Sequence, residues 1–139
     1  MKGKIFIDTN ILIYLLSITE PEKQQKCFEM IETLKLNNQT IAWSTQVIQE
    51  LSFNLIEKRN LSANQVKRTI ETFSDFELII NDLESIKKAL DINSQVQISF
   101  WDSLIISSAV SSKCSYLLSE DLHHGQRIEG VEIVNPFIV

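Results

Sequence analysis

One stretch near the N-terminus constrains the fold more than any other. It reads Ile5-Phe6-Ile7-Asp8-Thr9-Asn10-Ile11-Leu12, and its first three residues are β-branched or aromatic. Such an apolar run is typical of a buried parallel strand. Three polar residues end it, and apolar residues then return at close to helical spacing. Asp8 is therefore predicted to follow a central strand directly, at the sheet edge where ligands bind in open α/β proteins.

The rest of the chain alternates strand-like and helix-like segments. Short apolar runs predict further strands over residues 41–43, 76–80, 116–118 and 131–134. Helices are expected between them, and their predicted N-caps are Ser44 or Thr45, Ser62, Asp82 and Ser99. This order predicts an α/β fold with a mainly parallel sheet. The 139 residues contain no linker or repeat, so one domain is expected.

Composition narrows the functional classes. The net charge of −5 argues against a simple nucleic-acid-binding module, but it is compatible with a metal-dependent nuclease that gathers acids at its site. The apolar stretch over residues 5–18 is interrupted by Asp8 and Asn10 and is too short to span a bilayer, so a cytoplasmic protein without membrane contact is expected. Cys27 and Cys114 are predicted to be buried free thiols, with one disulfide as the alternative.

Two carboxylates follow predicted strands in the same way. Asp8 comes after the first strand, and Asp121 comes after the strand over residues 116–118. Because the carboxyl ends of parallel strands share one sheet edge, these two acids can meet there. The alternative for each is a helix N-cap, a position that Asp often occupies.

Two further acids lie on predicted helices. Asp102 falls within the apolar arc of its helix, where an unpartnered carboxylate would cost several kcal/mol or take up a proton. The alternative is a capping box in which Asp102 bonds the Ser99 amide. Glu50 lies beside an apolar stripe, so it either leans over a site or is simply solvated, and the spacing favours the second interpretation.

Four motifs in order resemble the PIN domain. They are Asp8-Thr9-Asn10-Ile11-Leu12, a Ser-led helix with Glu50, Phe100-Trp101-Asp102-Ser103-Leu104-Ile105, and Leu118-Ser119-Glu120-Asp121-Leu122. Their order and intervals are similar to those of VapC-type toxin ribonucleases. The ending, from Glu120 through His123-His124-Gly125 to Asn135-Pro136-Phe137, is similar to a branch described only as PIN-domain proteins.

The resemblance implies a fold and an activity. It implies a three-layer α/β/α sandwich with a five-stranded, mainly parallel sheet, forming a single nuclease domain over residues 1–139. It also implies Mg²⁺- or Mn²⁺-dependent cleavage of RNA phosphodiester bonds. An antitoxin protein and a second copy of the chain are the partners that it suggests, with Tyr14, Leu15 and Phe28 offering apolar surface for a homodimer.

The resemblance further implies one acidic pocket. Asp8 and Asp102 would be the primary metal ligands, while Asp121 and Glu50 would bind a second ion or metal-bound waters. The polar side chains expected around the metals are Thr9, Asn10 and Ser119.

Other residues have weaker functional interpretations. A basic cluster could guide an RNA backbone or form a solvated helical face; it consists of Lys58, Arg59, Lys67 and Arg68. Trp43 and Trp101 are predicted to pack in the core rather than stack on bases. His123 and His124 are expected at a helix end or on the surface.

Two other functional classes stay open. One is a catalytically weak PIN-fold module that binds nucleic acid or protein. The other is a phosphatase or phosphoacceptor domain, but an aspartate-nucleophile phosphatase needs a second Asp two residues after Asp8, where Asn10 stands.

Overall fold

A single sheet organises the protein in the computed structural model, which describes residues 1–138. Its strand order is β3-β2-β1-β4-β6-β5. The strands are β1 (Ile5–Ile7), β2 (Ile41–Ser44), β3 (Glu77–Ile79), β4 (Tyr116–Leu118), β5 (Arg127–Ile128) and β6 (Val131–Val134). All neighbouring pairs are parallel except β5 and β6, so the α/β class and the mainly parallel sheet are confirmed.

The prediction of five strands was wrong by one. The two-residue strand β5 pairs with β6 through a hairpin that the apolar pattern did not reveal. Its two turn residues, Glu129 and Gly130, have φ values of 46° and 87°. Positive φ at both central residues is the requirement of a type I′ turn, in which Gly is favoured. The signal that was missed is therefore the dipeptide Glu129-Gly130 between Ile128 and Val131.

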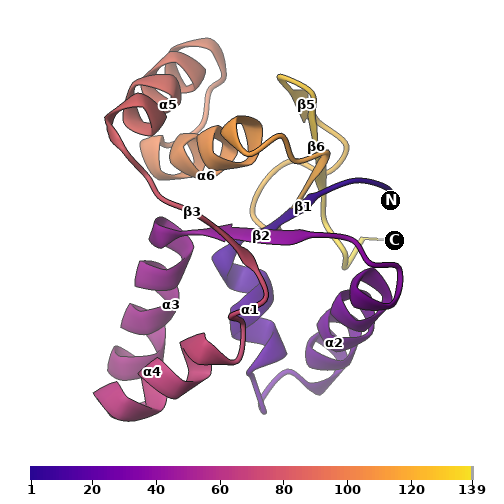
Figure 1. Ribbon diagram of the computed structural model, residues 1–139, viewed down its shortest axis with the longest axis vertical. Coiled ribbons are helices and arrows are strands. Elements are labelled where there is room, and N and C mark those ends of the chain that lie inside the picture. The colour runs from indigo at the N-terminus through magenta and orange to yellow at the C-terminus, as the bar shows by residue number, and fades with distance from the viewer. Residues whose placement is uncertain (139) are drawn as a thin grey trace.

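Helices cover both faces of the sheet, as Figure 1 shows. The helices on one face are α1 (Thr9–Leu15), α2 (Pro21–Leu36), α3 (Thr45–Glu57) and α4 (Ala63–Glu71). Those on the other face are α5 (Leu83–Gln95) and α6 (Phe100–Ser111). The three-layer α/β/α sandwich is thus confirmed. Among the described residues, no helix is long and apolar enough to cross a membrane.

Side-chain caps fix where the helices begin. Ser44, Ser62, Asp82 and Ser99 each accept a hydrogen bond from a backbone N–H in the first turn of the helix that follows. These bonds satisfy donors that the helix itself leaves free, and each is worth about 1 kcal/mol. The predicted caps are confirmed, and Ser44 rather than Thr45 caps α3.

The core lies between the sheet and the helices. The three residues of β1 are fully buried, as a central parallel strand requires. Trp43 is buried as predicted, whereas Trp101 is 62% exposed, so the prediction that it packs in the core was wrong. Cys27 and Cys114 are buried free thiols, which confirms that prediction.

The strand order places a topological switch point between β1 and β4. After β1 the chain builds β2 and β3 on one side, and it then returns to build β4 and β6 on the other. Helix α1 follows β1 and the β4–β5 connection follows β4, so the two segments leave the sheet in different directions and a crevice forms at the carboxyl ends of these strands. Ile7 pairs with Leu118, so the residues that follow the two strands, Asp8 and Ser119, lie side by side.

Candidate functional site

Asp8 lies at the centre of the crevice and is only 6% exposed. Its backbone N–H donates to the carbonyl of Leu118 at 3.0 Å, which extends the ladder between β1 and β4. One carboxylate oxygen caps α1 by accepting from the Thr9 amide at 2.7 Å, and the other accepts from the Ser119 hydroxyl at 2.8 Å. Asp8 is therefore both a helix N-cap and an acid at the sheet edge, two interpretations that the sequence had left as alternatives.

Burial raises the pKa of Asp8 from its ordinary value of 3.8 to about 6. The hydrogen bonds from Ser119 and Thr9 oppose this rise because they favour the carboxylate. The charges of Glu50 and Asp121 add to the rise, so both acids are close enough to repel Asp8. The folded protein thus holds a negative charge here that two hydrogen bonds stabilise only in part.

Asn10 lies between two of the acids. Its side-chain amide donates to Asp121 at 3.0 Å and makes a longer contact of 3.5 Å with Asp8. The Asp121 backbone N–H donates to the Ser119 hydroxyl at 3.2 Å. Asp121 is exposed and begins no helix, so the N-cap alternative does not apply to it.

Glu50 reaches the same crevice from α3. Its carboxylate accepts a hydrogen bond of 2.7 Å from the Thr9 hydroxyl, although the residue as a whole is exposed. The spacing had favoured a simply solvated Glu50, and this hydrogen bond shows that interpretation to be wrong. The contact brings together residues that are 41 positions apart in sequence.

Asp102 approaches from the other face of the sheet, on the first turn of α6. Its backbone N–H donates to the Ser99 hydroxyl at 3.1 Å. Within the part of the chain that the structure describes, α6 lacks the return bond of a capping box, whereas α4 and α5 have it. Burial raises the pKa of Asp102, the Ser99 hydroxyl partly offsets this, and the charge of Asp121 adds to the rise.

The four acids line one cavity of about 880 Å³ at the switch point. This volume is within the range of small-molecule sites and large enough for a nucleotide. The cavity is lined by residues from α1, α3, α6 and the β4–β5 connection: Asp8, Thr9, Asn10, Ile13, Gln46, Gln49, Glu50, Phe53, Asn54, Lys58, Trp101, Asp102, Ile105 and Asp121. Ser119 is fully buried behind Asp8 and supports it from outside this lining.

The donor set fits a hard divalent cation. Carboxylate oxygens suit Mg²⁺, which usually takes one or two of them and keeps several waters. Within residues 1–138, no three Asp, Glu, His or Cys side chains are already grouped tightly enough to hold a metal ion. Burial is the main reason that the pKa values of Asp8 and Asp102 are raised, and repulsion from the neighbouring acids adds to it. A cation would relieve that repulsion.

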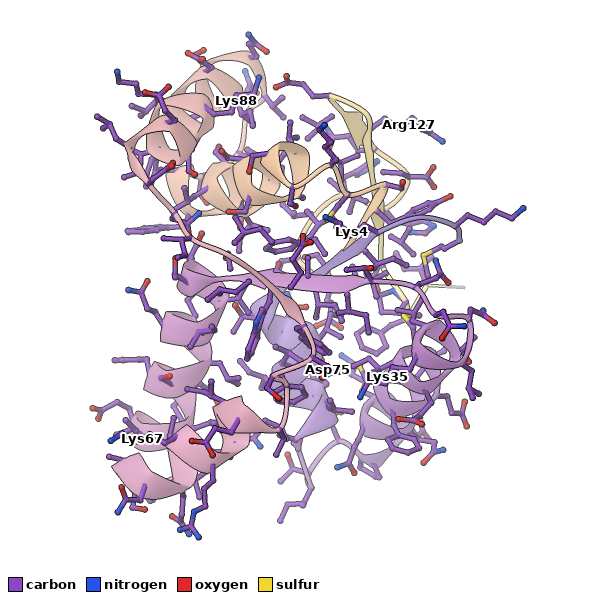
Figure 2. All side chains as sticks on the ribbon, viewed as in Figure 1. Lys4, Lys35, Lys67, Asp75, Lys88 and Arg127 are labelled. Carbon is purple, nitrogen blue, oxygen red and sulfur yellow. The ribbon has the colours of Figure 1, made fainter. Side chains whose placement is uncertain are left out.

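The sequence-predicted basic cluster is divided in the structure. Lys58 lines the cavity and is its only basic residue among those described. Arg59 donates to the carbonyls of Leu16 and Ile13 at 2.7 and 3.2 Å, so it satisfies the C-terminus of α1. Lys67 and Arg68 are exposed on α4 and do not line the cavity (Figure 2 shows Lys67).

Several cavity residues on α3 were not singled out from the sequence. Gln46, Phe53 and Asn54 line the cavity together with Glu50. They lie three or four positions from Glu50, and this spacing places them on the same helix face. The helical period counted from Glu50 was the signal that could have found them. Gln46 also donates to the Trp101 carbonyl at 3.1 Å, which joins α3 to α6 across the cavity.

The histidine pair lies outside this cavity. His123 is exposed, and the Nδ1 atom of His124 accepts from the Asn135 backbone N–H at 3.0 Å. His124 therefore ties the β4–β5 connection to the C-terminal segment.

The protein is thus an α/β protein with a mainly parallel sheet and an acidic cavity at the topological switch point of that sheet. The chain belongs to the PIN domain family, whose model matches residues 5–127. The predicted family resemblance is thus confirmed. Among curated protein sequences, none matches the chain significantly.

Solved structures share the fold. A chain of a toxin–antitoxin complex from Klebsiella pneumoniae is 21% identical, with a TM-score of 0.73, and the match covers 95% of this chain and 97% of that one. A chain of VapBC2 from Rickettsia felis, bound to promoter DNA, is 20% identical, with a TM-score of 0.69 and coverage of 94% and 96%. VapC20 from Mycobacterium tuberculosis, described as a toxin that cleaves the sarcin-ricin loop, is 13% identical, with a TM-score of 0.59 and coverage of 81% and 86%.

The raised pKa of Asp8 predicts how stability changes with pH in metal-free buffer. The folded protein binds this proton more tightly than the unfolded chain, so the free energy of unfolding should fall as pH rises from about 4 to about 6. A shift of the Asp8 pKa from 3.8 to about 6 corresponds to a fall of at most about 3 kcal/mol in the free energy of unfolding. Urea unfolding with EDTA, across pH 4 to 7.5, should show this fall in the wild type and a smaller one in Asp8→Asn. Parallel pH profiles for the two proteins would contradict the assignment.

Proposed function

We propose that this protein is a Mg²⁺- or Mn²⁺-dependent endoribonuclease that hydrolyses RNA phosphodiester bonds. The observation that carries the proposal is the cavity at the switch point, which is lined by Asp8, Glu50, Asp102 and Asp121. The charges of these acids act on one another, since Glu50 and Asp121 raise the pKa of Asp8 and Asp121 raises that of Asp102. Membership of the PIN domain family supports the same activity.

The proposed roles of the acids follow from their positions. Asp8 and Asp102 would be the primary ligands, because Asp8 lines the cavity from the end of β1, Asp102 lines it from the first turn of α6, and both are at least half-buried. Asp121 and Glu50 would hold a second ion or metal-bound waters. When bound, the metal supplies an activated water and neutralises charge on the phosphate. No side chain is then needed as a nucleophile.

Neighbouring polar groups hold the acids in place. Ser119 and the Thr9 amide fix the two oxygens of Asp8, and the Thr9 hydroxyl fixes Glu50. Asn10 keeps Asp121 beside Asp8. Pre-formed hydrogen bonds of this kind reduce the cost of ordering the ligands when substrate arrives.

The cavity wall suits single-stranded RNA. Phe53 and Trp101 are each 62% exposed and line the same cavity as the acids, so unstacked bases could stack on them. Lys58 adds one positive charge for the backbone. Cleavage of an unstructured RNA in preference to a duplex of the same sequence is therefore expected.

We further propose that the protein is the toxin of a toxin–antitoxin pair and acts on cytoplasmic RNA. The support is its structural likeness to chains from complexes described as toxin–antitoxin or VapBC assemblies. An antitoxin partner follows from this proposal.

Substitutions at Asp102 test the catalytic proposal most sharply. Both Asp102→Asn and Asp102→Glu should lose at least about a hundredfold in kcat/KM, because several kcal/mol of charge stabilisation is lost or misplaced. Asp102→Asn should be no less stable than the wild type in EDTA. The Asn side chain leaves the hydrogen bond from the backbone N–H of residue 102 to Ser99 in place. It also replaces a carboxylate whose pKa is raised by burial with a neutral group. Cleavage of mixed RNA with and without Mn²⁺, together with thermal melts, measures both effects.

A matched control is Asp91→Asn, which removes the same charge from an exposed position on α5 and should remain active. An active Asp102→Glu protein with a destabilised Asp102→Asn would return Asp102 to a structural role. A wild type that binds RNA but never cleaves it would favour the alternative of a catalytically weak binding module.

We also propose that the protein forms a homodimer. Of the three residues predicted to form its surface, Phe28 is 51% exposed, whereas Tyr14 and Leu15 are half-buried. Light scattering at tens of micromolar should give the mass of a dimer, and Phe28→Glu should shift it towards the mass of a monomer. A wild-type protein with the mass of one chain would remove this proposal.

A further inference from the structure

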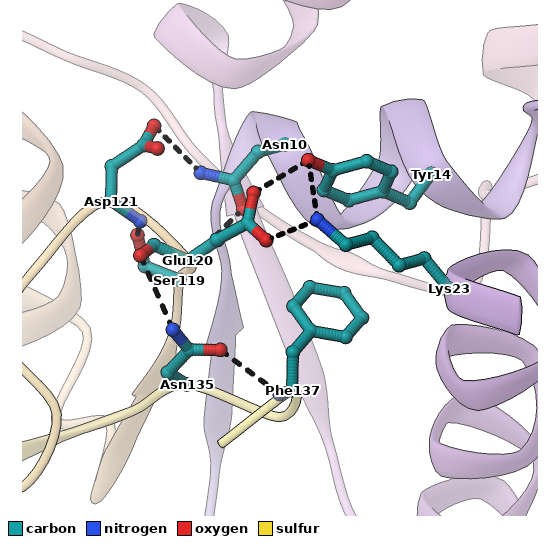
Figure 3. Close-up of polar contacts among 8 residues, drawn as sticks. All are labelled: Asn10, Tyr14, Lys23, Ser119, Glu120, Asp121, Asn135 and Phe137. Carbon is teal, nitrogen blue, oxygen red and sulfur yellow. Dashed lines mark hydrogen bonds and ion pairs between the residues drawn. The ribbon is translucent and has the colours of Figure 1, made fainter. Parts of the chain in front are cut away.

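Glu120 and Asp121 are adjacent but their carboxylates point in different directions, as Figure 3 shows. Asp121 lines the acidic cavity, and Glu120 does not. The Glu120 carboxylate instead accepts from the Tyr14 hydroxyl at 2.5 Å and from the Lys23 ammonium at 2.6 Å. Glu120 is therefore bonded to side chains of α1 and α2 and is not free to bind a ligand.

The main chain of Glu120 is held as well as its side chain. Its backbone N–H donates to the side-chain oxygen of Asn10 at 3.2 Å. Its carbonyl accepts from the side-chain amide of Asn135 at 3.3 Å. The same Asn10 donates its amide to Asp121 at 3.0 Å. One residue is thus fixed at three points by groups distant in sequence, directly before the acid that enters the cavity.

Two aromatic rings pack against the Lys23 ammonium group. The Lys23 nitrogen lies 4.5 Å from the centre of the Tyr14 ring and 5.1 Å from that of Phe137. The two rings meet edge to face with their centres 5.3 Å apart. Phe137 is held in turn, because its N–H donates to the Asn135 side-chain oxygen at 2.9 Å. A cation that packs against two rings and bonds a carboxylate holds its position more firmly than a surface pair without such contacts.

Asp121 depends on this support more than Asp8 does. It is exposed, and Asn10 donates the one hydrogen bond that its carboxylate receives within the described chain. The position of its oxygens is therefore set mainly by the backbone of residues 119–121. Asp8, in contrast, is buried and bonded through both oxygens.

We infer that Lys23 and Glu120 are positioning residues for Asp121. Together with Tyr14 and Phe137 they form what we call the Glu120 clamp. It holds the β4–β5 connection so that the Asp121 carboxylate stays at the cavity. The inference rests on the proposed metal-dependent function, and it assigns to the Glu120 clamp a role in metal affinity. Neighbouring residues that orient metal ligands typically change affinity or activity by 10–100-fold when they are substituted.

The test measures Mn²⁺ binding directly, by the loss of the electron paramagnetic resonance signal of free Mn²⁺. Lys23→Met removes the ion pair and keeps the length of the stem, and it should raise the dissociation constant for Mn²⁺ roughly tenfold. Lys23→Arg should restore most of the affinity. The matched control is Lys88→Met (Figure 2 labels Lys88), which breaks a similar ion pair with Glu129. Neither residue lines the cavity, so Mn²⁺ affinity should be unchanged. Glu120→Gln provides a second variant of the same clamp.

A double-mutant cycle shows whether the effect passes through Asp121. In an Asp121→Asn background, Lys23→Met should cause no further loss of Mn²⁺ affinity. Unchanged affinity in both Lys23→Met and Glu120→Gln would overturn the inference while leaving the proposed function intact, as would an undiminished loss in the Asp121→Asn background. A wild-type protein that does not bind Mn²⁺ would overturn both.

Discussion

The burial of the Asp8 carboxylate is the interaction on which the rest of the site depends. A charge at this depth is costly, and the raised pKa of Asp8 records that cost. The fold tolerates it because the Thr9 amide and the Ser119 hydroxyl meet its two oxygens. The Ser119 hydroxyl is available because β1 and β4 are parallel neighbours in a fixed register, and the Thr9 amide is available because α1 begins directly after Asp8. The position of the acid is therefore a consequence of sheet topology.

The other acids reach the same place by longer routes. Glu50 comes from α3 and Asp102 from α6, which lie on opposite faces of the sheet (Figure 1). Asp121 comes from the connection after β4 and depends on Asn10 and the Glu120 clamp. Repulsion among four carboxylates works against the fold, so the caps and the buried β1 must more than offset it. Such a local conflict with stability is typical of functional sites.

Much of the fold and part of the site could be predicted from the sequence, and there is a physical reason for each success and each failure. Strands, caps and the place of Asp8 depend on local patterns, so they could be predicted. The hairpin formed by β5 and β6 was not predicted, because a two-residue strand shows almost no periodicity in sequence. The exposure of Trp101, the hydrogen bonds from Arg59 to the end of α1 and the contact of Lys23 with the Tyr14 ring all depend on how distant elements pack. Spacing alone left Glu50 ambiguous, and only the family resemblance selected it.

Anomalous diffraction from crystals grown with Mn²⁺ tests most directly whether these four acids form one divalent-cation site. We expect a manganese peak in the cavity beside Asp8, and the loss of that peak in Asp8→Asn crystals grown in the same way. An empty cavity at millimolar Mn²⁺, or an unchanged peak in the Asp8→Asn protein, would contradict this expectation.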